Sequence, residues 1–435
     1  LDSSDKINNV RPAADFTFFT RRRFFPLFCT QFLGALNDNL LKTALLVLVS
    51  YAGLSVAGWD APQLINAAAG LFILPFFLFS ASAGRIAEKF DKALIARWVK
   101  LSELGIMLLA GWGFFSHHAG FLLLALFLMG THSTFFGPVK YAILPQTLRP
   151  NELVSGNGLI EMGTFIAVLV GQLSGSLLMM QGEAVVVGVL VVVAGLGVVS
   201  SFAMPPTPPT APDLMLSANL LADTRAVWRE ARRQPTVWAA IIGISWFWLL
   251  GSVFLTQMPT FTRLHLGGDV QVYALVLTVF SLSIGVGSVL CARWSAGVLH
   301  LSLALWGLLG MALAGAALSV LVFPLWQGAL RAPLAFIADP TACAALVLFA
   351  LLGLTGGVFT VPLYTWLQLA SPVDFRAQAV AANNIVNGLF MVAATGGSAL
   401  VLMLSPHISL LFLLTSLGNV PMYFWLRRQT RTVAK

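Results

Sequence analysis

Residues 24–53 read FFPLFCTQFLGALNDNLLKTALLVLVSYAG, an apolar run interrupted by charge at Asp38 and Lys42. A membrane-spanning helix needs about 20 mostly apolar residues, and this run is long enough. Charged groups are costly at membrane depth, so they usually mark a pathway or a binding site. Because a spacing of four puts both side chains on one helix face, we expect Asp38 and Lys42 to neutralise each other in part. The alternative is a structural ion pair buried against neighbouring helices.

The rest of the chain repeats this apolar pattern. Of its 435 residues, 58% are hydrophobic and 10% are charged, which is typical of a polytopic membrane protein. Twelve segments are long and apolar enough to span a membrane: 24–51, 62–83, 94–115, 121–141, 153–180, 184–202, 237–261, 270–292, 299–323, 341–367, 377–404 and 407–426. The sequence therefore predicts an all-α membrane protein with twelve transmembrane helices in two six-helix halves.

The longest polar segment divides the two halves. We expect an N-terminal segment (1–23), a first half (24–203), a linker (204–236), a second half (237–426) and a tail (427–435). The linker opens with a stiff proline-rich stretch at 205–212, and an amphipathic stretch follows at 214–233. That stretch is typical either of a helix on the anionic membrane surface or of a solvated linker helix, and both remain open.

The basic residues are concentrated in the loops on one side of the predicted membrane spans. The net charge is +8, but the basic residues cluster in alternate loops, and Arg263 and Arg331 alone fall on the other side. This bias predicts that both termini are cytoplasmic, and it argues against nucleic acid as a partner. The three cysteines are odd in number and lie in apolar segments without metal-ligand spacing, so we expect small buried hydrophobic residues and no disulfide framework. We also expect neither a metal nor a cofactor.

Residues 84–92, GRIAEKFDK, follow the second predicted span and resemble the signature loop of the major facilitator superfamily. In that family the acid and the bases of this loop hold the cytoplasmic ends of neighbouring helices in one state. Glu88 stands where the family usually has Asp, and Asp91 replaces its usual Gly. The resemblance implies a major facilitator fold and a set of gating residues: Gly84, Arg85, Glu88, Lys89, Asp91 and Lys92.

A closer resemblance covers most of the chain. Residues 31–39 (QFLGALNDN), 137–141 (GPVKY) and 156–161 (GNGLIE) are similar to the lysophospholipid transporter (LplT-type) branch of this superfamily. Residues 246–257 (WFWLLGSVFLTQ) are similar to the variant often fused to acyltransferase and acyl-carrier-protein ligase domains. The resemblance implies alternating-access movement of lysophosphatidylethanolamine and related lysolipids from the outer to the inner leaflet of the bacterial inner membrane, for reacylation. It also implies an inner-membrane acyltransferase or acyl-carrier-protein synthetase as a partner.

Polar residues within the predicted spans supply candidate ligands for such a lipid. Lys42 or Lys140 offers a cation to the phosphate, and Asp38 or Glu161 offers a carboxylate to the ammonium. The candidate substrate-binding residues are Gln31, Asp38, Asn39, Lys42, Lys140, Tyr141, Asn157, Glu161, Gln257, Asn383 and Asn387.

Some of these charges also have structural interpretations. Lys140 either binds ligand, extends to the cytoplasmic surface or pairs with Glu161. We expect Glu103 to pair with Lys100 or Arg97.

Two other functions stay open. One is proton-coupled transport of a drug or small solute, with Asp38 or Glu161 as the proton carrier. The other is a non-transporting lysolipid-binding partner of an acyltransferase, which would use residues 214–233 as the partner surface. The sequence shows no nucleophile triad, phosphate-cradling loop or metal cluster, so we do not expect an enzyme.

Overall fold

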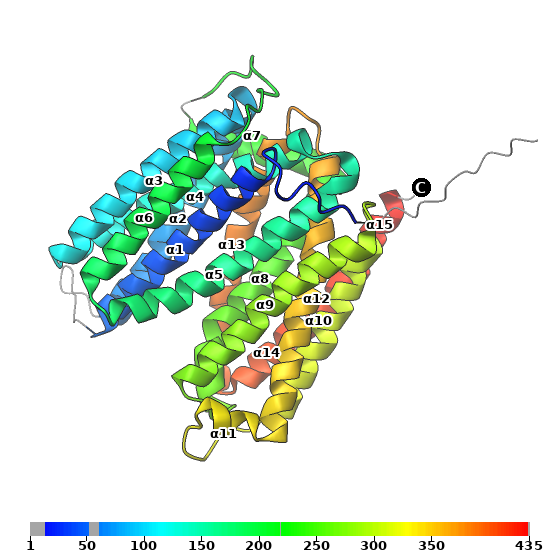
Figure 1. Ribbon diagram of the computed structural model, residues 1–435. Helices are drawn as coiled ribbons and strands as arrows, with labels where there is room; N and C mark the ends of the chain where they lie inside the picture. The colour runs from blue at the N-terminus through cyan, green and yellow to red at the C-terminus, as the bar shows by residue number, and fades with distance from the viewer. Residues whose placement is uncertain (1–13, 52–60, 218, 434–435) are drawn as a thin grey trace, which may run out of the picture.

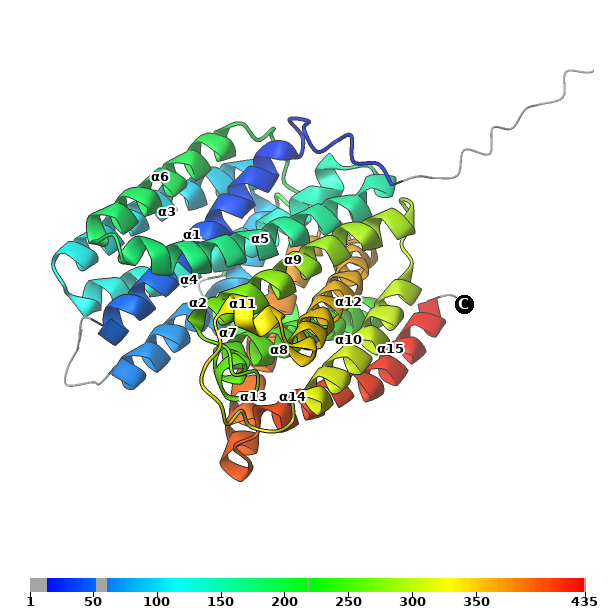
Figure 2. The same cartoon turned by 60° about the horizontal axis from the view of Figure 1, so that its bottom comes forward.

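The computed structural model describes residues 14–51, 61–217 and 219–433. Residues 1–13 of the predicted N-terminal segment and 434–435 of the predicted tail lie outside these ranges. Two lobes of long helices make up the molecule (Figure 1), and Figure 2 shows the same lobes with the opposite end brought forward.

The first lobe contains α1 (Phe25–Tyr51), α2 (Ala61–Lys89), α3 (Lys92–Phe115), α4 (Ala119–Thr147), the short η1 (Pro150–Glu152), α5 (Leu153–Met179) and α6 (Glu183–Phe202). The linker helix is α7 (Leu220–Arg233). The second lobe contains α8 (Pro235–Leu264), α9 (Val270–Ser295), α10 (Leu301–Leu321), the short α11 (Pro333–Ile337), α12 (Pro340–Ala370), α13 (Arg376–Leu404), α14 (Ile408–Leu417) and α15 (Asn419–Val433).

The expected twelve-helix architecture is confirmed. In the described ranges, 11 helical spans are long and apolar enough to cross a membrane, and α14 and α15 together make the last of them. The twelfth is α3, whose apolar character is reduced by Lys92, Arg97, Lys100 and Glu103. It packs along α4 and α6 inside the first lobe, so each lobe has six spanning helices.

The two ends of the bundle differ. One end carries α7 and α15 and is called here the α7 end, and the other carries α11 and is called the α11 end. The lobes lean together at the α7 end and splay toward the α11 end (Figure 1). One hydrophobic core contains residues of both lobes, such as Phe165 and Phe247 with ring centroids 5.9 Å apart. A second core, around Met107 and Leu122, belongs to the first lobe alone.

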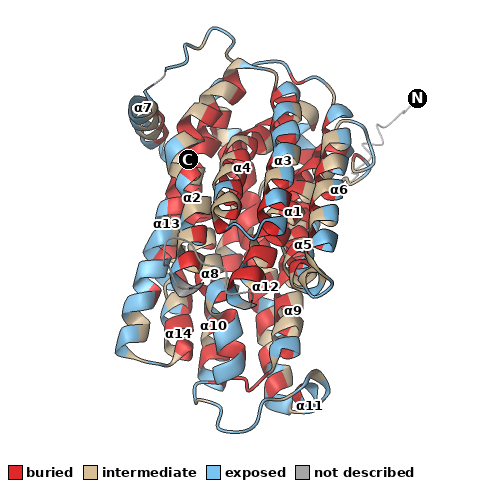
Figure 3. Cartoon of the chain, turned by 90° about the vertical axis from the view of Figure 1, so that its left-hand side faces the viewer, coloured by how far each residue is buried: buried red, intermediate tan, exposed pale blue. Residues whose placement is uncertain are grey.

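Glycines mark where the lobes touch. A Cβ built on Gly84 of α2 would lie 2.7 Å from Ala381 Cβ of α13, and one on Gly158 of α5 would lie 2.8 Å from the Ser288 carbonyl oxygen of α9. Farther along α13, Gly396 and Gly397 have nothing within 4 Å of such a Cβ. The part of α13 near the α11 end is largely exposed (Figure 3). The contact between α2 and α13 therefore belongs to the α7 end.

The segment predicted as a loop after the second span is mostly helix, which corrects the expectation. Residues 84–89 form the last turns of α2, Phe90 and Asp91 connect the two helices, and Asp91 caps the start of α3. The Asp91 carboxylate accepts hydrogen bonds from the backbone N–H groups of Ala93 (2.8 Å) and Leu94 (3.0 Å). The connection between α2 and α3 therefore consists of two residues, and the second of them is the N-cap.

The linker helix begins at Leu220, later than predicted, because Asn219 caps it through the Ala222 N–H at 3.0 Å. Its buried residues include Asp223, Val227 and Ala231, and the helix packs against α2, α8 and α13. The helix is thus docked on the bundle, an arrangement that neither sequence-based interpretation described.

Candidate functional site

Asp38 and Lys42 lie half-buried on α1 and are not joined by an ion pair within 4.0 Å. Asp38 Oδ2 accepts a hydrogen bond from the Ser133 hydroxyl of α4 at 2.8 Å. The Lys42 ammonium lies 4.2 Å from the ring centroid of Phe72 on α2, which is a cation–π contact. The expected partial neutralisation therefore involves no direct ion pair, and each group also contacts a neighbouring helix.

A second polar group lies between the lobes, nearer the α7 end. The Tyr141 hydroxyl of α4 donates to Glu161 Oε1 of α5 at 2.5 Å. The Tyr141 ring stacks on Tyr364 of α12 with centroids 4.3 Å apart and an interplanar angle of 6°. Lys140 does not form an ion pair with Glu161 in the described part of the chain, and its ammonium lies 4.7 Å from the Tyr141 ring centroid. This group joins α4 and α5 of the first lobe to α12 of the second.

Asn157 of α5 binds directly across the lobes. Its amide nitrogen donates to Gln368 Oε1 of α12 at 2.7 Å, and Gln368 Nε2 donates back to Asn157 Oδ1 at 3.1 Å. Gln368 Nε2 also donates to the Tyr141 carbonyl oxygen at 3.1 Å. Neither Gln368 nor Tyr364 was among the candidate residues, although both are polar side chains in the apolar run of α12.

The remaining candidates are more dispersed. Gln31 Oε1 accepts from the Thr164 hydroxyl at 3.1 Å, and the Asn39 amide donates to the carbonyl of its own helix at Ala35. On α13, Asn387 Oδ1 accepts from the Ser245 hydroxyl of α8 at 2.7 Å. Asn383, also on α13, has a fully buried amide without a partner at hydrogen-bond geometry among the described residues. Gln257 is half-buried on α8.

The predicted gating residues gather at the α7 end. The buried Glu88 carboxylate accepts from the Ala377 N–H at the start of α13 and from the Thr210 hydroxyl of the linker. Three basic residues of the set bind the linker as well: Arg85 pairs with Asp223 at 3.0 Å, Lys89 donates to the Leu214 carbonyl at 2.8 Å, and Lys92 donates to Thr210 Oγ1 at 3.3 Å. Gly84, against Ala381, completes the junction of α2, α13 and the linker.

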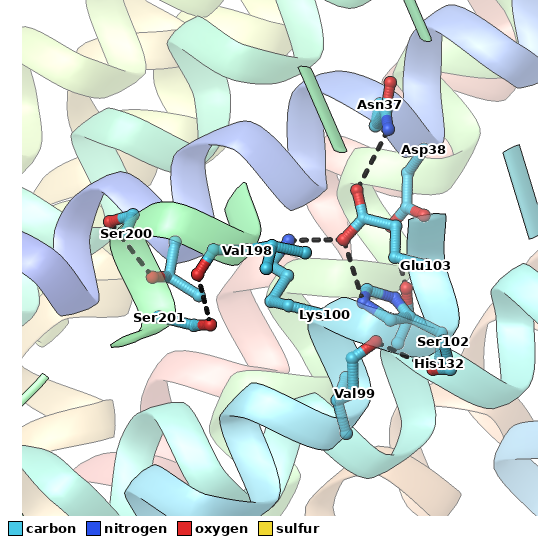
Figure 4. Close-up of polar contacts among 12 residues, drawn as sticks. Asn37, Asp38, Val99, Lys100, Ser102, Glu103, His132, Val198, Ser200 and Ser201 are labelled. Carbon is cyan, nitrogen blue, oxygen red and sulfur yellow. Dashed lines mark hydrogen bonds and ion pairs between the residues drawn. The ribbon is translucent and has the colours of Figure 1, made fainter. Parts of the chain in front are cut away.

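A buried network inside the first lobe is centred on Glu103 (Figure 4). The Glu103 carboxylate pairs with Lys100, as predicted, and both side chains are fully buried. It also contacts His132 Nε2 of α4 at 3.0 Å and accepts from the Asn37 amide of α1 at 3.0 Å. The Lys100 contact is predictable from sequence, because a spacing of three places both groups on one helix face. The His132 contact is not predictable in this way, because only the packing of α4 against α3 brings His132 to Glu103.

An apolar groove runs beside this network, between α3 and α4 and the end of α2. Its volume is about 710 Å³, and its walls include the exposed Trp98 and the side chains of Leu109 and Phe135, with His132 also lining it. At membrane depth such walls face hydrocarbon. The residues that line the groove come from α2, α3 and α4, with Phe90 between α2 and α3, and do not include the charged residues on α1 and α5.

Comparison with known proteins agrees with this architecture. The family model described as Major Facilitator Superfamily matches residues 27–395, which span both lobes. The chain belongs to the major facilitator superfamily. The crystal structure of the human organic anion transporter MFSD10 (TETRAN), with a TM-score of 0.73 and 15% identity, covers 93% of this chain and 99% of that chain. At that identity it shows the superfamily fold alone.

Lysophospholipid transporters of bacteria are among the relatives of this chain. The Lysophospholipid transporter LplT of Serratia proteamaculans (strain 568) is 24% identical over 383 residues, 86% of this chain and 87% of that protein. The Lysophospholipid transporter LplT of Klebsiella pneumoniae (strain 342) is 26% identical over 377 residues, 85% of this chain and 86% of that protein. The resemblance noted in the sequence to this branch of the superfamily is thereby confirmed.

Proposed function

We propose that this protein is a lysophospholipid transporter that moves lysophosphatidylethanolamine and related lysolipids from the outer to the inner leaflet of a bacterial inner membrane. Its similarity to LplT proteins extends over both lobes, which supports a shared substrate class. The superfamily fold supports a mechanism of alternating access, in which the two lobes rock about a site between them.

The observation that carries the proposal is a set of charges at membrane depth that form no direct ion pair. Asp38, Lys42 and Lys140 are half-buried and Glu161 is fully buried, yet none forms an ion pair within 4.0 Å in the described ranges. Charges of this kind are expensive within a membrane unless water or a ligand meets them. Both signs are present, which suits a zwitterionic headgroup.

The geometry supports specific roles for these groups. In this proposal Lys42 and Lys140 meet the phosphate as compact cations, and Asp38 and Glu161 meet the ammonium. The single acyl chain stays in hydrocarbon, because apolar walls and lipid are nearly equivalent environments for it. Transport then lowers the cost of taking the headgroup through the bilayer, with no covalent step.

The orientation of the molecule in the membrane decides whether the lobes are open to the cytoplasm or to the outside. We assign the α7 end to the cytoplasm, because the basic residues of alternate loops lie there. The lobes then touch on the cytoplasmic side and splay toward the outside, which is the state that accepts lipid from the outer leaflet. Release inside requires the Asn157–Gln368 pair and the Glu88–Ala377 contact to separate. Lysolipid delivered there is a substrate for reacylation, so we propose an inner-membrane acyltransferase or acyl-carrier-protein synthetase as the partner.

Reconstitution in liposomes tests the proposal. The protein should accelerate inward movement of labelled lysophosphatidylethanolamine, and Asp38→Ala or Lys42→Ala should slow it about tenfold or more, since each removes one charge-assisted contact. Arg428→Ala, an exposed change on α15, is the control and should leave the rate unchanged. Equal movement with and without protein would reject the substrate assignment.

One observation favours a second candidate, proton-coupled transport of a drug or small solute. Glu161 Oε2 is buried and has no hydrogen-bond partner in the described structure, so this carboxyl group has a free site for a proton. That function predicts solute movement that follows a pH gradient and is lost in Glu161→Gln, with no movement of lysolipid.

A further inference from the structure

A cavity of about 440 Å³ lies at the α7 end, where the segment before α1 meets the turn between α4 and α5. Three arginines line it: Arg21 and Arg23 come just before α1, and Arg149 comes just before η1. Each lies within a few residues of the start of a spanning helix, so the cavity sits at the boundary of the membrane. The cavity is separate from the candidate site at membrane depth, because none of the charged residues of that site lines it.

The cavity is held in shape by buried contacts. Phe18 is fully buried and meets Phe24 edge to face with ring centroids 4.9 Å apart, which anchors the segment before α1. Arg23 forms a two-pronged pair with Glu152, with both N–O distances 2.6 Å, and also donates to the Thr147 carbonyl at 3.0 Å. These contacts join the start of α1 to the turn that leads into α5.

The two carboxylates of the cavity already have donors. Glu152 accepts from Arg23 and from the Arg149 backbone N–H at 2.8 Å. Asp15 accepts from the Thr17 hydroxyl at 2.7 Å and the Thr17 N–H at 2.8 Å, and these bonds hold the pKa of Asp15 below its usual value. By contrast, the guanidinium groups of Arg21 and Arg149 form no ion pair in the described ranges, and both side chains are exposed.

The net charge of the residues that line the cavity indicates which class of ligand it suits. Three arginines and two ionised carboxylates leave the cavity with one excess positive charge. A phosphodiester carries one negative charge, and its oxygens suit the planar donors of arginine. Basic pockets at the cytoplasmic boundary of a membrane protein are typical sites for anionic lipid headgroups.

We propose that this cavity binds the headgroup of an anionic diacyl phospholipid of the phosphatidylglycerol type, through Arg21 and Arg149. Arg23 is held by Glu152 and supports the site without being released. The inference goes beyond the proposed function and shares with it only the assignment of the α7 end to the cytoplasm. It concerns a resident lipid and not the transported one.

Lipid binding to the purified full chain tests the inference. Phosphatidylglycerol, phosphatidylethanolamine and inorganic phosphate are titrated separately, and binding is followed by native mass spectrometry and by the thermal midpoint. Phosphatidylglycerol should bind the unaltered protein and raise its midpoint. In the variant Arg21→Gln/Arg149→Gln, binding should weaken about tenfold or more and the midpoint shift should disappear.

The matched control is Arg427→Gln/Arg428→Gln, which removes two exposed arginines from α15 at the same end. It should bind phosphatidylglycerol as the unaltered protein does. Equal binding by both double variants would overturn the proposal. Equal binding of phosphatidylethanolamine would also overturn it, as would displacement by inorganic phosphate at the same concentration, since that assigns the cavity to a free anion. Because transport is not measured, failure here leaves the proposed function standing, and the reverse also holds.

Discussion

Glu103 shows how one buried charge organises its surroundings. Lys100, His132 and Asn37 bring three helices to the same carboxylate, and the Lys100 and Glu103 side chains are fully out of solvent. A buried ion pair offers little net stability over apolar residues of the same volume, but removing one partner strands the other charge. The network around Glu103 therefore constrains how α1, α3 and α4 pack more than it stabilises them.

Single and double substitutions of this pair should differ sharply. Lys100→Met should lower the free energy of unfolding by about 3–5 kcal/mol, because Glu103 loses its cation. Adding Glu103→Met should restore a large part of that loss, even though Asn37 and His132 lose a partner. Unfolding in mixed micelles measures both, with the exposed Arg428→Met as the control. A double variant as unstable as the sum of the two single changes would contradict this account.

At the scale of the helices, α2 and α13 close the α7 end because glycine stands at their crossing. A Cβ at Gly84 would lie 2.7 Å from Ala381 Cβ, 2.9 Å from Gln378 Cα and 3.0 Å from the Ala377 carbonyl oxygen. Two of these three atoms are backbone, so the neighbour has little freedom to move aside. The same crossing brings the start of α13 to Glu88.

Gly84→Val should therefore push α2 and α13 apart at the α7 end. Spin labels at Phe90 and Asp374, two exposed positions near that end, should report a distance several ångströms longer than in the protein with Gly84. Gly105→Val is the matched control, because a Cβ at Gly105 has nothing within 4 Å. An unchanged distance in Gly84→Val would show that this crossing does not set the closure.

For the whole molecule, the question is whether the lobes must part at the α7 end during each cycle. Asn157 and Gln368 are 211 residues apart in sequence and exchange two hydrogen bonds across the lobes. Alternating access requires contacts of this kind to break and to re-form at the opposite end.

A short bifunctional thiol reagent across Asn157→Cys and Gln368→Cys should hold the lobes together at the α7 end. Lysolipid transport in liposomes should then stop, while the same two substitutions without the reagent should retain part of it. The control pair Gly70→Cys and Gly396→Cys is chosen because a Cβ at either site has nothing within 4 Å. Continued transport by the crosslinked Asn157/Gln368 variant would argue against rocking of the lobes.

Much of the fold follows from local composition. A helix in lipid must satisfy its own backbone hydrogen bonds, so a sufficiently long apolar run predicts a span wherever it occurs. The Lys100–Glu103 contact is also local, since a spacing of three places both groups on one face. Even α3, with its four charged residues, was recognisable as a span from the apolar stretch that follows them.

Contacts between distant helices depend on packing that no short stretch of sequence encodes. His132 reaches Glu103 only because α3 and α4 lie side by side, and the linker helix docks because α2, α8 and α13 together form the surface it covers. Spanning segments are set by the free energy of placing each residue in lipid, a property of that segment alone. Which polar groups meet within the bundle is set by the relative positions of helices far apart in the chain, and the tertiary structure alone determines those.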